Sequence, residues 1–236
     1  PTAAEYEWPP VMHVIAIGTS GVPKMASFLT PMDADTGMTI RIVPEASPAK
    51  QGILVAEGDM FSALVDKTGL GSMLEAREDF ATRQGGPWPI RVLWLSDLSN
   101  AGFFVRGDSD IKTLADIGPG TRIAVWDMKE STLRWPRALL NWIQLDEKEI
   151  VWFDAGTTAG SVRAISDGRA DIMFFFPISP MIFEAAAAPH GIRFIDLNSE
   201  LDPEGAARLN EHIPGTTFAP IAVGPEGAVG VWGTIT

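Results

Sequence analysis

The stretch that decides the fold runs from residue 109 to residue 145 and reads SDIKTLADIGPGTRIAVWDMKESTLRWPRALLNWIQL. Its local signals predict a short helix at 111–117, a Gly-Pro-Gly break, a strand at 122–126, a polar loop, and a helix that ends near Leu145. Where a strand passes through polar residues into a helix, backbone N–H groups converge on one spot and favour negative charge. The stretch therefore predicts an anion-binding turn, which is typical of a binding module.

Apolar runs alternate with helical patterns on both sides of this stretch. Strands are also predicted at 13–17, 38–43, 59–65, 90–95, 102–106, 150–153, 171–176, 193–197 and 216–223. Helices are predicted at 22–29, from the N-cap Ser47 to about residue 57, and at 68–77, 158–167 and 180–188. Regular alternation of this kind indicates mainly parallel sheets with helices on their faces. We therefore predict an α/β fold.

A short pattern occurs once in each half of the chain and predicts two lobes. A helix, a glycine and an immediate strand are expected around Gly58 and again around Gly168. In both places the glycine would close the helix C-terminus, because glycine readily takes the left-handed conformation found there. We expect residues 1–100 to form lobe I and residues 101–216 to form lobe II, with 217–236 returning to lobe I.

Composition excludes several function classes. The 236 residues carry a net charge of −12, and the excess of acid is present in both halves, so there is no basic surface for nucleic acid. The sequence has no cysteine, which excludes disulfides, thiolate nucleophiles and cysteine-ligated zinc. The longest uncharged apolar run, at 172–183, is shorter than the roughly 20 residues of a membrane helix. We therefore expect no direct membrane insertion.

No catalytic signature is present in the sequence. Nucleotide-binding glycine motifs, the G-x-S-x-G elbow and the H-E-x-x-H motif are all missing. The three histidines, His13, His190 and His212, have no metal-ligand spacing, and Ser20 has no identifiable base. We therefore expect a protein that is not an enzyme and that has no catalytic residue, no cofactor and no metal site.

Four predicted strand ends carry polar turns that lead into helices. Ligands of open α/β sheets bind at the carboxyl ends of strands, so these turns are the candidate ligand site. Lysines in an acidic protein favour a carboxylate ligand, and aromatic residues at strand ends could supply apolar walls. The alternatives are helix capping for each turn, solvated side chains for the lysines, and core positions for the aromatic residues. The candidate residues are Thr19, Ser20, Gly21, Ser47, Lys50, Gln51, Trp126, Lys129, Ser131, Thr132, Thr157, Thr158 and Phe176.

Two runs carry a resemblance to a known family. The run I-K-T-L-A-D-I at 111–117, followed by P-G-T-R-I-A-V, resembles the element that opens the second lobe of type II periplasmic solute-binding proteins. The run A-I-S-D-G-R-A-D-I-M-F-F at 164–175 is similar to another element of that superfamily. Together with V-I-A-I-G-T-S-G at 14–21 and the segment 37–59, these runs resemble the TAXI family, the solute receptors of one class of TRAP transporters.

The resemblance spans residues 14–223 and implies a function. A TAXI receptor is a two-lobed periplasmic protein, secreted by a signal peptide that is then removed. It closes by a hinge motion on a small organic acid or amino acid in the interlobe cleft. It then presents this solute to membrane-embedded TRAP permease subunits. In that family further helices of the first lobe follow the return strand, so the resemblance also implies that the C-terminal part of lobe I is missing here.

This sequence departs from the family pattern at the expected ligand loops. The family's second-lobe loop G-S-G-T aligns with Lys129-Glu130-Ser131-Thr132, so only the threonine is kept. Glu130 would repel an anion unless it turns outward or pairs with Lys129. Pro136 predicts that the helix starts late or kinks. The alternatives to a receptor are a sensory module or an enzyme on the same fold, for which Glu45 or Asp127 would have to act as the general base.

Overall fold

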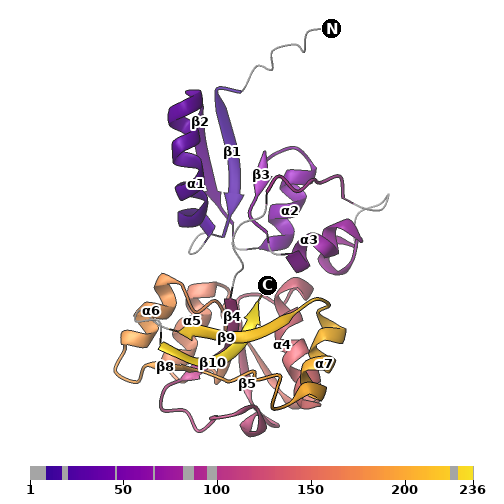
Figure 1. Cartoon of the computed structure of the whole chain (residues 1–236), viewed down its shortest axis with the longest axis vertical. Coiled ribbons are helices and arrows are strands. Elements are labelled where there is room, and N and C mark those ends of the chain that lie inside the picture. Colours follow the sequence, from indigo (N-terminus) through magenta and orange to yellow (C-terminus); the bar gives the residue numbers. More distant parts are fainter. Residues whose placement is uncertain are drawn as a thin grey trace. The chain divides into compact units, whose positions relative to one another are not determined.

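The computed structural model describes residues 9–17, 21–45, 47–65, 67–81, 88–94, 100–223 and 228–235 (Figure 1). The chain divides into two compact units, Pro1–Val92 and Leu93–Thr236, which are called unit 1 and unit 2 below. Strands alternate with helices through most of both units, which confirms the predicted α/β class.

Unit 1 contains a parallel sheet of three strands in the order β2-β1-β3. Apolar side chains of β1, among them Met12 and Val14, pack against Met25 and Leu29 of the first helix and form its core. The strands are β1 (Val11–Ala16), β2 (Thr39–Pro44) and β3 (Ser62–Ala63), and the helices are α1 (Gly21–Thr36), α2 (Pro48–Ala56), α3 (Lys67–Leu74) and the 3₁₀ helix η1 (Glu78–Phe80).

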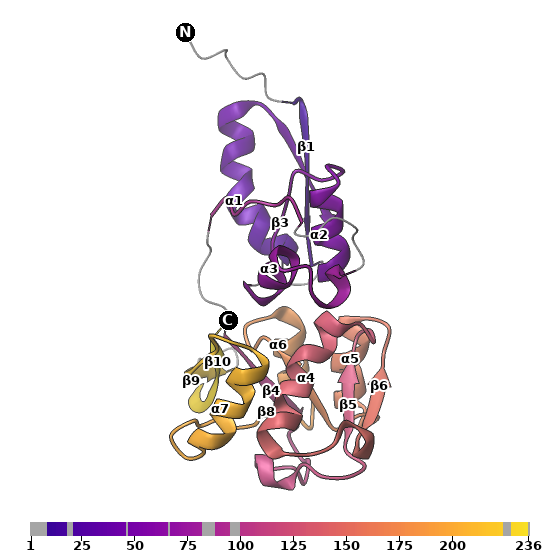
Figure 2. The same cartoon turned by 90° about the vertical axis from the view of Figure 1, so that its right-hand side faces the viewer.

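Unit 2 contains a mixed sheet in the order β6-β5-β7-β4-β10-β9, with β8 also paired to β4 (Figure 2). Strands β5, β6 and β7 are parallel, whereas β4 runs antiparallel to β7, β8 and β10. The strands are β4 (Asn100–Arg106), β5 (Arg122–Val125), β6 (Val151–Asp154), β7 (Ile172–Phe175), β8 (Ile192–Phe194), β9 (Thr217–Val223) and β10 (Ala228–Ile235). The helices are α4 (Glu130–Ile143), α5 (Thr158–Ser166), α6 (Pro180–Ala187), α7 (Pro203–His212) and the 3₁₀ helices η2 (Leu114–Asp116) and η3 (Glu147–Glu149).

The repeat predicted around the two glycines is confirmed in atomic detail. Gly58 and Gly168 both have positive φ, +87° and +69°. After Gly58 two successive N–H groups donate to the carbonyl of Leu54, at 2.9 and 3.1 Å, and after Gly168 two donate to the carbonyl of Ala164, at 2.8 and 3.1 Å. The following strands, β3 and β7, pair in parallel with the first strand of their β-α-β repeat. The strand orders β2-β1-β3 and β6-β5-β7 therefore correspond.

Helix α4 anchors the core of unit 2. The Trp135 ring stacks on Phe174 of β7 with centroids 4.5 Å apart and an interplanar angle of 8°, and Phe103 of β4 lies 5.1 Å from Phe174. Pro136 lies inside the helix, yet α4 begins at Glu130, so the helix does not start late. Its buried face fixes the position of the turn that precedes it.

Besides differences in element bounds, such as β3 being shorter and α1 longer than expected, three expectations differ from the structure. Residues 90–94 are not a strand, because Val92, Leu93 and Trp94 are 52%, 59% and 43% exposed and pair with no neighbouring strand in the part of the chain described. The helix expected at 111–117 shortens to η2, since the Asp116 carboxylate accepts the N–H groups that precede it. The return segment forms the hairpin β9-β10, which pairs with β4 and belongs to unit 2 rather than to the first lobe.

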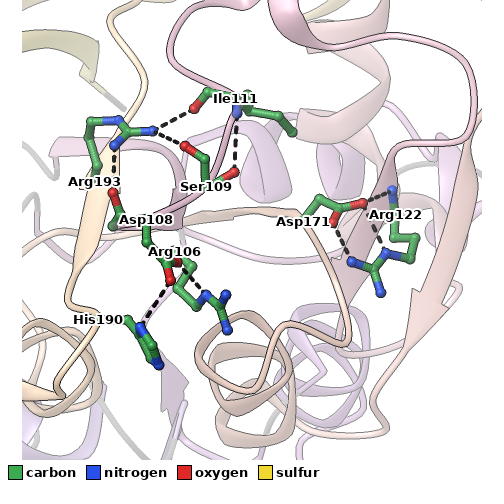
Figure 3. A network of polar contacts seen from close by, with 9 residues as sticks. Arg106, Asp108, Ser109, Ile111, Arg122, Asp171, His190 and Arg193 are labelled. Atoms are coloured by element: carbon green, nitrogen blue, oxygen red, sulfur yellow. Dashed lines mark hydrogen bonds and ion pairs between the residues drawn. The ribbon is translucent and has the colours of Figure 1, made fainter.

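A network of charged side chains joins the strand ends of unit 2 (Figure 3). Arg193 of β8 donates to the carbonyls of Gly107, Ser109 and Ile111 at 2.7 to 3.1 Å, which holds the chain after β4. Arg122 of β5 donates three hydrogen bonds to the Asp171 carboxylate. One comes from its backbone N–H at 2.7 Å, and two come from its guanidinium nitrogens at 3.0 and 2.5 Å. These contacts connect segments that lie far apart in the sequence.

The Arg122–Asp171 pair predicts an acid-dependent loss of stability. Burial acts to raise the pKa of Asp171, but the hydrogen bonds and the charge of Arg122 outweigh it and hold the pKa below its ordinary value. Because folding lowers this pKa, its contribution to stability is present above the unfolded pKa of about 3.9 and is lost as the pH falls through the folded pKa.

We expect Asp171→Asn to lower the melting temperature near neutral pH. At acid pH the melting temperatures of the variant and the wild type should lie closer together. Thermal unfolding between about pH 3 and pH 7 measures this difference. Asp110→Asn, at an exposed carboxylate of the same unit, is the matched control. A melting-temperature difference for Asp171→Asn that does not shrink on acidification would contradict the argument.

Candidate functional site

In unit 2 the predicted site residues gather at one edge of the sheet. Strands β5 and β6 are parallel neighbours, and β7 is the parallel neighbour of β5 on its other side. The carboxyl ends of all three strands therefore lie at the same edge. Each of these ends is followed by predicted residues, which are Trp126, Lys129, Ser131, Thr132, Thr157, Thr158 and Phe176.

The turn after β5 holds two buried polar atoms that lack a partner within the described chain. The Thr132 side chain lies in the first turn of α4, is 4% exposed, and its Oγ1 makes no hydrogen bond there. The Trp126 Nε1 is also buried without an acceptor, while its ring lies edge-on to Phe175 with centroids 6.4 Å apart. A buried polar group without a partner costs about 1–3 kcal/mol. These two groups, one in the first turn of α4 and one directly after β5, therefore have unused hydrogen-bonding capacity.

The charge of Glu130 is partly offset by Arg137. The Glu130 carboxylate pairs with Arg137, two turns further along α4, and Arg137 also pairs with Glu147 at 2.9 Å. The hydrogen bond from Arg137 holds the pKa of Glu147 below its ordinary value. The repulsion expected between Glu130 and an anion is reduced accordingly, because Arg137 offsets part of its charge.

The turn after β6 mainly caps its helix. Thr157 is the N-cap of α5, and its hydroxyl accepts the N–H of Gly160 at 3.0 Å. Thr158 is 8% exposed at the first position of that helix. Phe176, after β7, packs edge-on against Phe174 and Phe175 with centroids 6.4 and 5.5 Å away. Thr157 thus fulfils the capping alternative, and Phe176 has the contacts of a core residue.

In unit 1 the turn between β2 and α2 is a compact polar cluster. The Ser47 hydroxyl accepts the N–H of Lys50 at 3.3 Å as the predicted N-cap, and the Lys50 ammonium pairs with Glu45 at 2.6 Å. Gln51 is 1% exposed and donates to the Glu45 carbonyl at 2.6 Å, but its Oε1 has no hydrogen-bond partner among the described residues. Lys50 is therefore already paired with a carboxylate. The Oε1 of Gln51 remains a buried acceptor without a hydrogen-bond partner among the described residues.

The turn after β1 lies largely outside the described residues, including the candidate residues Thr19 and Ser20. Gly21 is described and begins α1. A Cβ on Gly21 would lie 3.0 Å from the Cβ of Ala16, so glycine there lets the helix start close against β1. This close approach gives Gly21 a packing role.

Arg134 is a buried charged residue that the sequence did not single out. It lies one turn after Glu130 on α4 and is only 5% exposed. Nothing in its local pattern separates it from a solvated helical arginine, because its burial depends on how α4 packs. It adds a positive charge to the half of the helix that begins at the candidate site.

The described residues contain no candidate metal cluster and no candidate membrane-spanning helix. No group of three or more histidine, cysteine, aspartate or glutamate side chains in the described chain could hold a metal ion. No helix described here is long and apolar enough to cross a membrane. The two carboxylates considered as bases are both engaged, since Glu45 pairs with Lys50 and Asp127 accepts the N–H of Lys129 at 3.1 Å.

Comparison with known proteins identifies the fold. No protein-family model and no curated protein sequence matches the chain. Among solved structures, it is similar to the alkanesulfonate-binding protein SsuA from Xanthomonas axonopodis pv. citri bound to MOPS, with a TM-score of 0.53 and 13% identity over 88% of this chain and 74% of that one.

Two further solved structures extend this likeness. PhnD1 from Prochlorococcus marinus in complex with methylphosphonate has a TM-score of 0.52 and 10% identity over 88% and 85% of the two chains. An ancestral arginine-binding protein bound to glutamine has a TM-score of 0.51 and 12% identity over 89% and 94%. Because the sequence identities are this low, the similarity is evidence for the fold alone. The chain has the α/β fold of the two-lobed periplasmic solute-binding proteins.

Proposed function

We propose that this protein is an extracytoplasmic solute-binding receptor that holds a small organic acid or amino acid. The observation that carries the proposal is the buried Thr132 hydroxyl in the first turn of α4, which has no partner among the described residues; the buried Trp126 indole N–H, directly after β5, is likewise without a partner among them. A receptor without its ligand is expected to keep such groups, because the ligand supplies the missing partners.

The chemistry of the α4 turn favours an acidic group on the ligand. The indole N–H can only donate, a hydroxyl can donate, and a helix N-terminus presents further N–H groups together with a partial positive charge. Lys129, the N-cap residue, and the buried Arg134 add positive charge to the same part of α4. A carboxylate, sulfonate or phosphonate can accept hydrogen bonds from the Thr132 hydroxyl and from the N–H groups of the helix N-terminus, and hydrogen bonds to a charged acceptor are the stronger ones.

The named ligands of the similar structures agree with this chemistry. MOPS carries a sulfonate, methylphosphonate a phosphonate and glutamine a carboxylate, so each has an acidic group. The buried Oε1 of Gln51 in unit 1 is an acceptor and could receive an N–H of the ligand. Among these classes an amino acid offers both an acidic group and an N–H donor.

The remaining parts of the proposal rest on the sequence. The resemblance of the runs at 111–125 and 164–175 to the TAXI family favours TRAP permease subunits as the membrane partner and a periplasmic location. A receptor of that family closes by a hinge motion, and closure is driven only by contacts that are better made in the closed form. The engaged states of Glu45 and Asp127 favour binding over catalysis.

Titration calorimetry of the double variant Lys129→Ala/Thr132→Ala tests the site. The panel of solutes contains amino acids, dicarboxylates, alkanesulfonates and alkylphosphonates, and we expect at least one to bind the wild type. The double variant should bind that solute about tenfold or more weakly, because it loses one charge and one hydrogen bond to an anion. Lys148→Ala, at another lysine of unit 2, is the control and should bind normally. Normal affinity in the double variant would remove this turn from the site, and turnover of the solute would favour an enzyme.

A further inference from the structure

Glu130 is a carboxylate at a place where the helix itself attracts anions. It is the first residue of α4 and the acidic residue of its first turn, the turn that also contains Thr132. A helix N-terminus carries a partial positive charge, which attracts a carboxylate side chain of the first turn as well as an anion from solution. A free Glu130 side chain would therefore compete with the acidic group of a ligand for the same end of α4.

In the structure the Glu130 carboxylate is directed along the helix instead. The Arg137 Nη1 donates to the Glu130 Oε2, and the two residues are seven positions apart on α4. With a rise of about 1.5 Å per residue, Arg137 lies about 10 Å further along the helix axis than Glu130. The contact therefore draws the carboxylate away from the N-terminus of α4.

Arg137 is itself held by residues outside α4. Its Nε and Nη2 donate to the two carboxylate oxygens of Glu147 in η3, at 2.9 and 3.1 Å, which is the bidentate geometry of a strong ion pair. The Glu147 carboxylate also accepts the indole N–H of Trp152 in β6 at 3.1 Å. The guanidinium nitrogen that Glu147 does not use, Nη1, is the one that donates to Glu130. Arg137 is therefore fixed in the position that holds Glu130.

We propose that Arg137 is a positioning residue of the solute site. By pairing with Glu130 it prevents that carboxylate from occupying the N-terminus of α4, where the acidic group of the ligand binds. Arg137 does not touch the ligand in this account, because it acts through Glu130 alone. The inference rests on the proposed function, since it concerns the same turn, and it explains how a turn that contains a glutamate can still receive an anion.

A double-mutant cycle on the full chain tests the inference. Methanesulfonate and glutamine are the probes, and the amide resonances of residues 131 and 132 report binding in an NMR titration at low ionic strength. Arg137→Gln should weaken the binding of both probes about fivefold, because the freed Glu130 carboxylate competes with their acidic groups. The double variant Arg137→Gln/Glu130→Gln should return to within about twofold of the wild-type affinity.

The cycle separates positioning from the charge of Arg137 itself. If Arg137 acted only through its own positive charge, Glu130→Gln would have the same effect in the presence and in the absence of Arg137. We expect Glu130→Gln to tighten binding clearly in the Arg137→Gln background and much less in the wild type. Arg163→Gln, which removes an exposed arginine from the last turn of α5, is the control for net charge and should bind both probes normally.

A further variant breaks the same contact without changing Arg137. Glu130→Asp keeps the charge but shortens the side chain, so its carboxylate should no longer reach Arg137, while the pair of Arg137 with Glu147 stays intact. This variant should weaken both probes as Arg137→Gln does. The comparison therefore remains decisive even if Arg137→Gln fails to fold.

The outcomes distinguish this inference from the proposed function. If the wild type binds neither probe, the proposed site for an acidic group at α4 fails, and the inference falls with it. Wild-type binding that is unchanged in Arg137→Gln and in Glu130→Asp would overturn the inference alone. A loss of affinity in Arg137→Gln that Glu130→Gln does not restore would also overturn it, because Arg137 would then not act through Glu130.

Discussion

Replacing Gly205 with alanine is expected to lower the stability of unit 2 by about 3 kcal/mol, because the added methyl group has no space. A Cβ at this position would lie 2.1 Å from the Trp142 Nε1 and 2.3 Å from the Asp202 Oδ2. The Trp142 ring cannot move aside easily, since it is 1% exposed, bonded to Asp202 and edge-on to Phe218 with centroids 5.3 Å apart. The substitution therefore disrupts the contact between α4 and α7.

Urea unfolding followed by circular dichroism measures the effect. Gly118→Ala is the matched control, because a Cβ there would have no atom within 4 Å and the backbone does not require positive φ. We expect the control to unfold at the same urea concentration as the wild type and the Gly205 variant to unfold at a clearly lower one. Equal midpoints for the two variants would show that the α4–α7 contact is looser than the structure indicates.

Replacing Thr132 with valine is expected to change stability and ligand affinity in opposite directions. The substitution keeps the shape of the side chain and removes a buried hydroxyl that has no partner in the described structure. The ligand-free protein should gain about 1 kcal/mol, since a desolvated polar group is no longer unpaired. Affinity for the solute should fall about tenfold, since the ligand loses a hydrogen bond to its acidic group.

A second buried threonine supplies the control for this experiment. Thr216 is 5% exposed, and its hydroxyl donates to the carbonyl of Ile213 at 2.8 Å. Thr216→Val should therefore cost about 1 kcal/mol and leave the affinity unchanged. Urea unfolding without ligand and titration calorimetry with the solute measure the two quantities. A Thr132→Val protein that binds the solute normally would show that the hydroxyl is unpaired for a reason unrelated to the ligand.

The caps and the repeat could be predicted from sequence because they depend on neighbouring residues. Ser47 and Thr157 cap their helices through N–H groups three positions further on. Gly58 and Gly168 close their helices through the same local hydrogen bonds. Each of these structures forms within one turn of chain, so the residue types at fixed spacing are sufficient to indicate it.

The prediction of a strand at 90–95 was wrong because a strand depends on residues that are distant in the sequence. Its run of apolar residues has the composition of a strand, but a strand also needs a partner, and residues 90–94 pair with none of the strands that the structure describes. The hairpin β9-β10 shows the same dependence, because pairing with β4 places it in unit 2. Composition and period do not specify which backbone lies alongside a given run.

The sequence by itself determined the α/β class, the order of most helices and strands, and the polar turns at the strand ends, since these follow from local periodicity and capping. Only the tertiary structure decided which of those turns has unused hydrogen bonds. In the tertiary structure Lys50 forms an ion pair with Glu45, and Glu130 forms one with Arg137. The Thr132 hydroxyl and the Trp126 indole N–H have no hydrogen-bond partner among the described residues. The reason is physical: whether a polar atom is satisfied depends on burial and on neighbours brought in by packing, and neither is encoded in the spacing of residues along the chain.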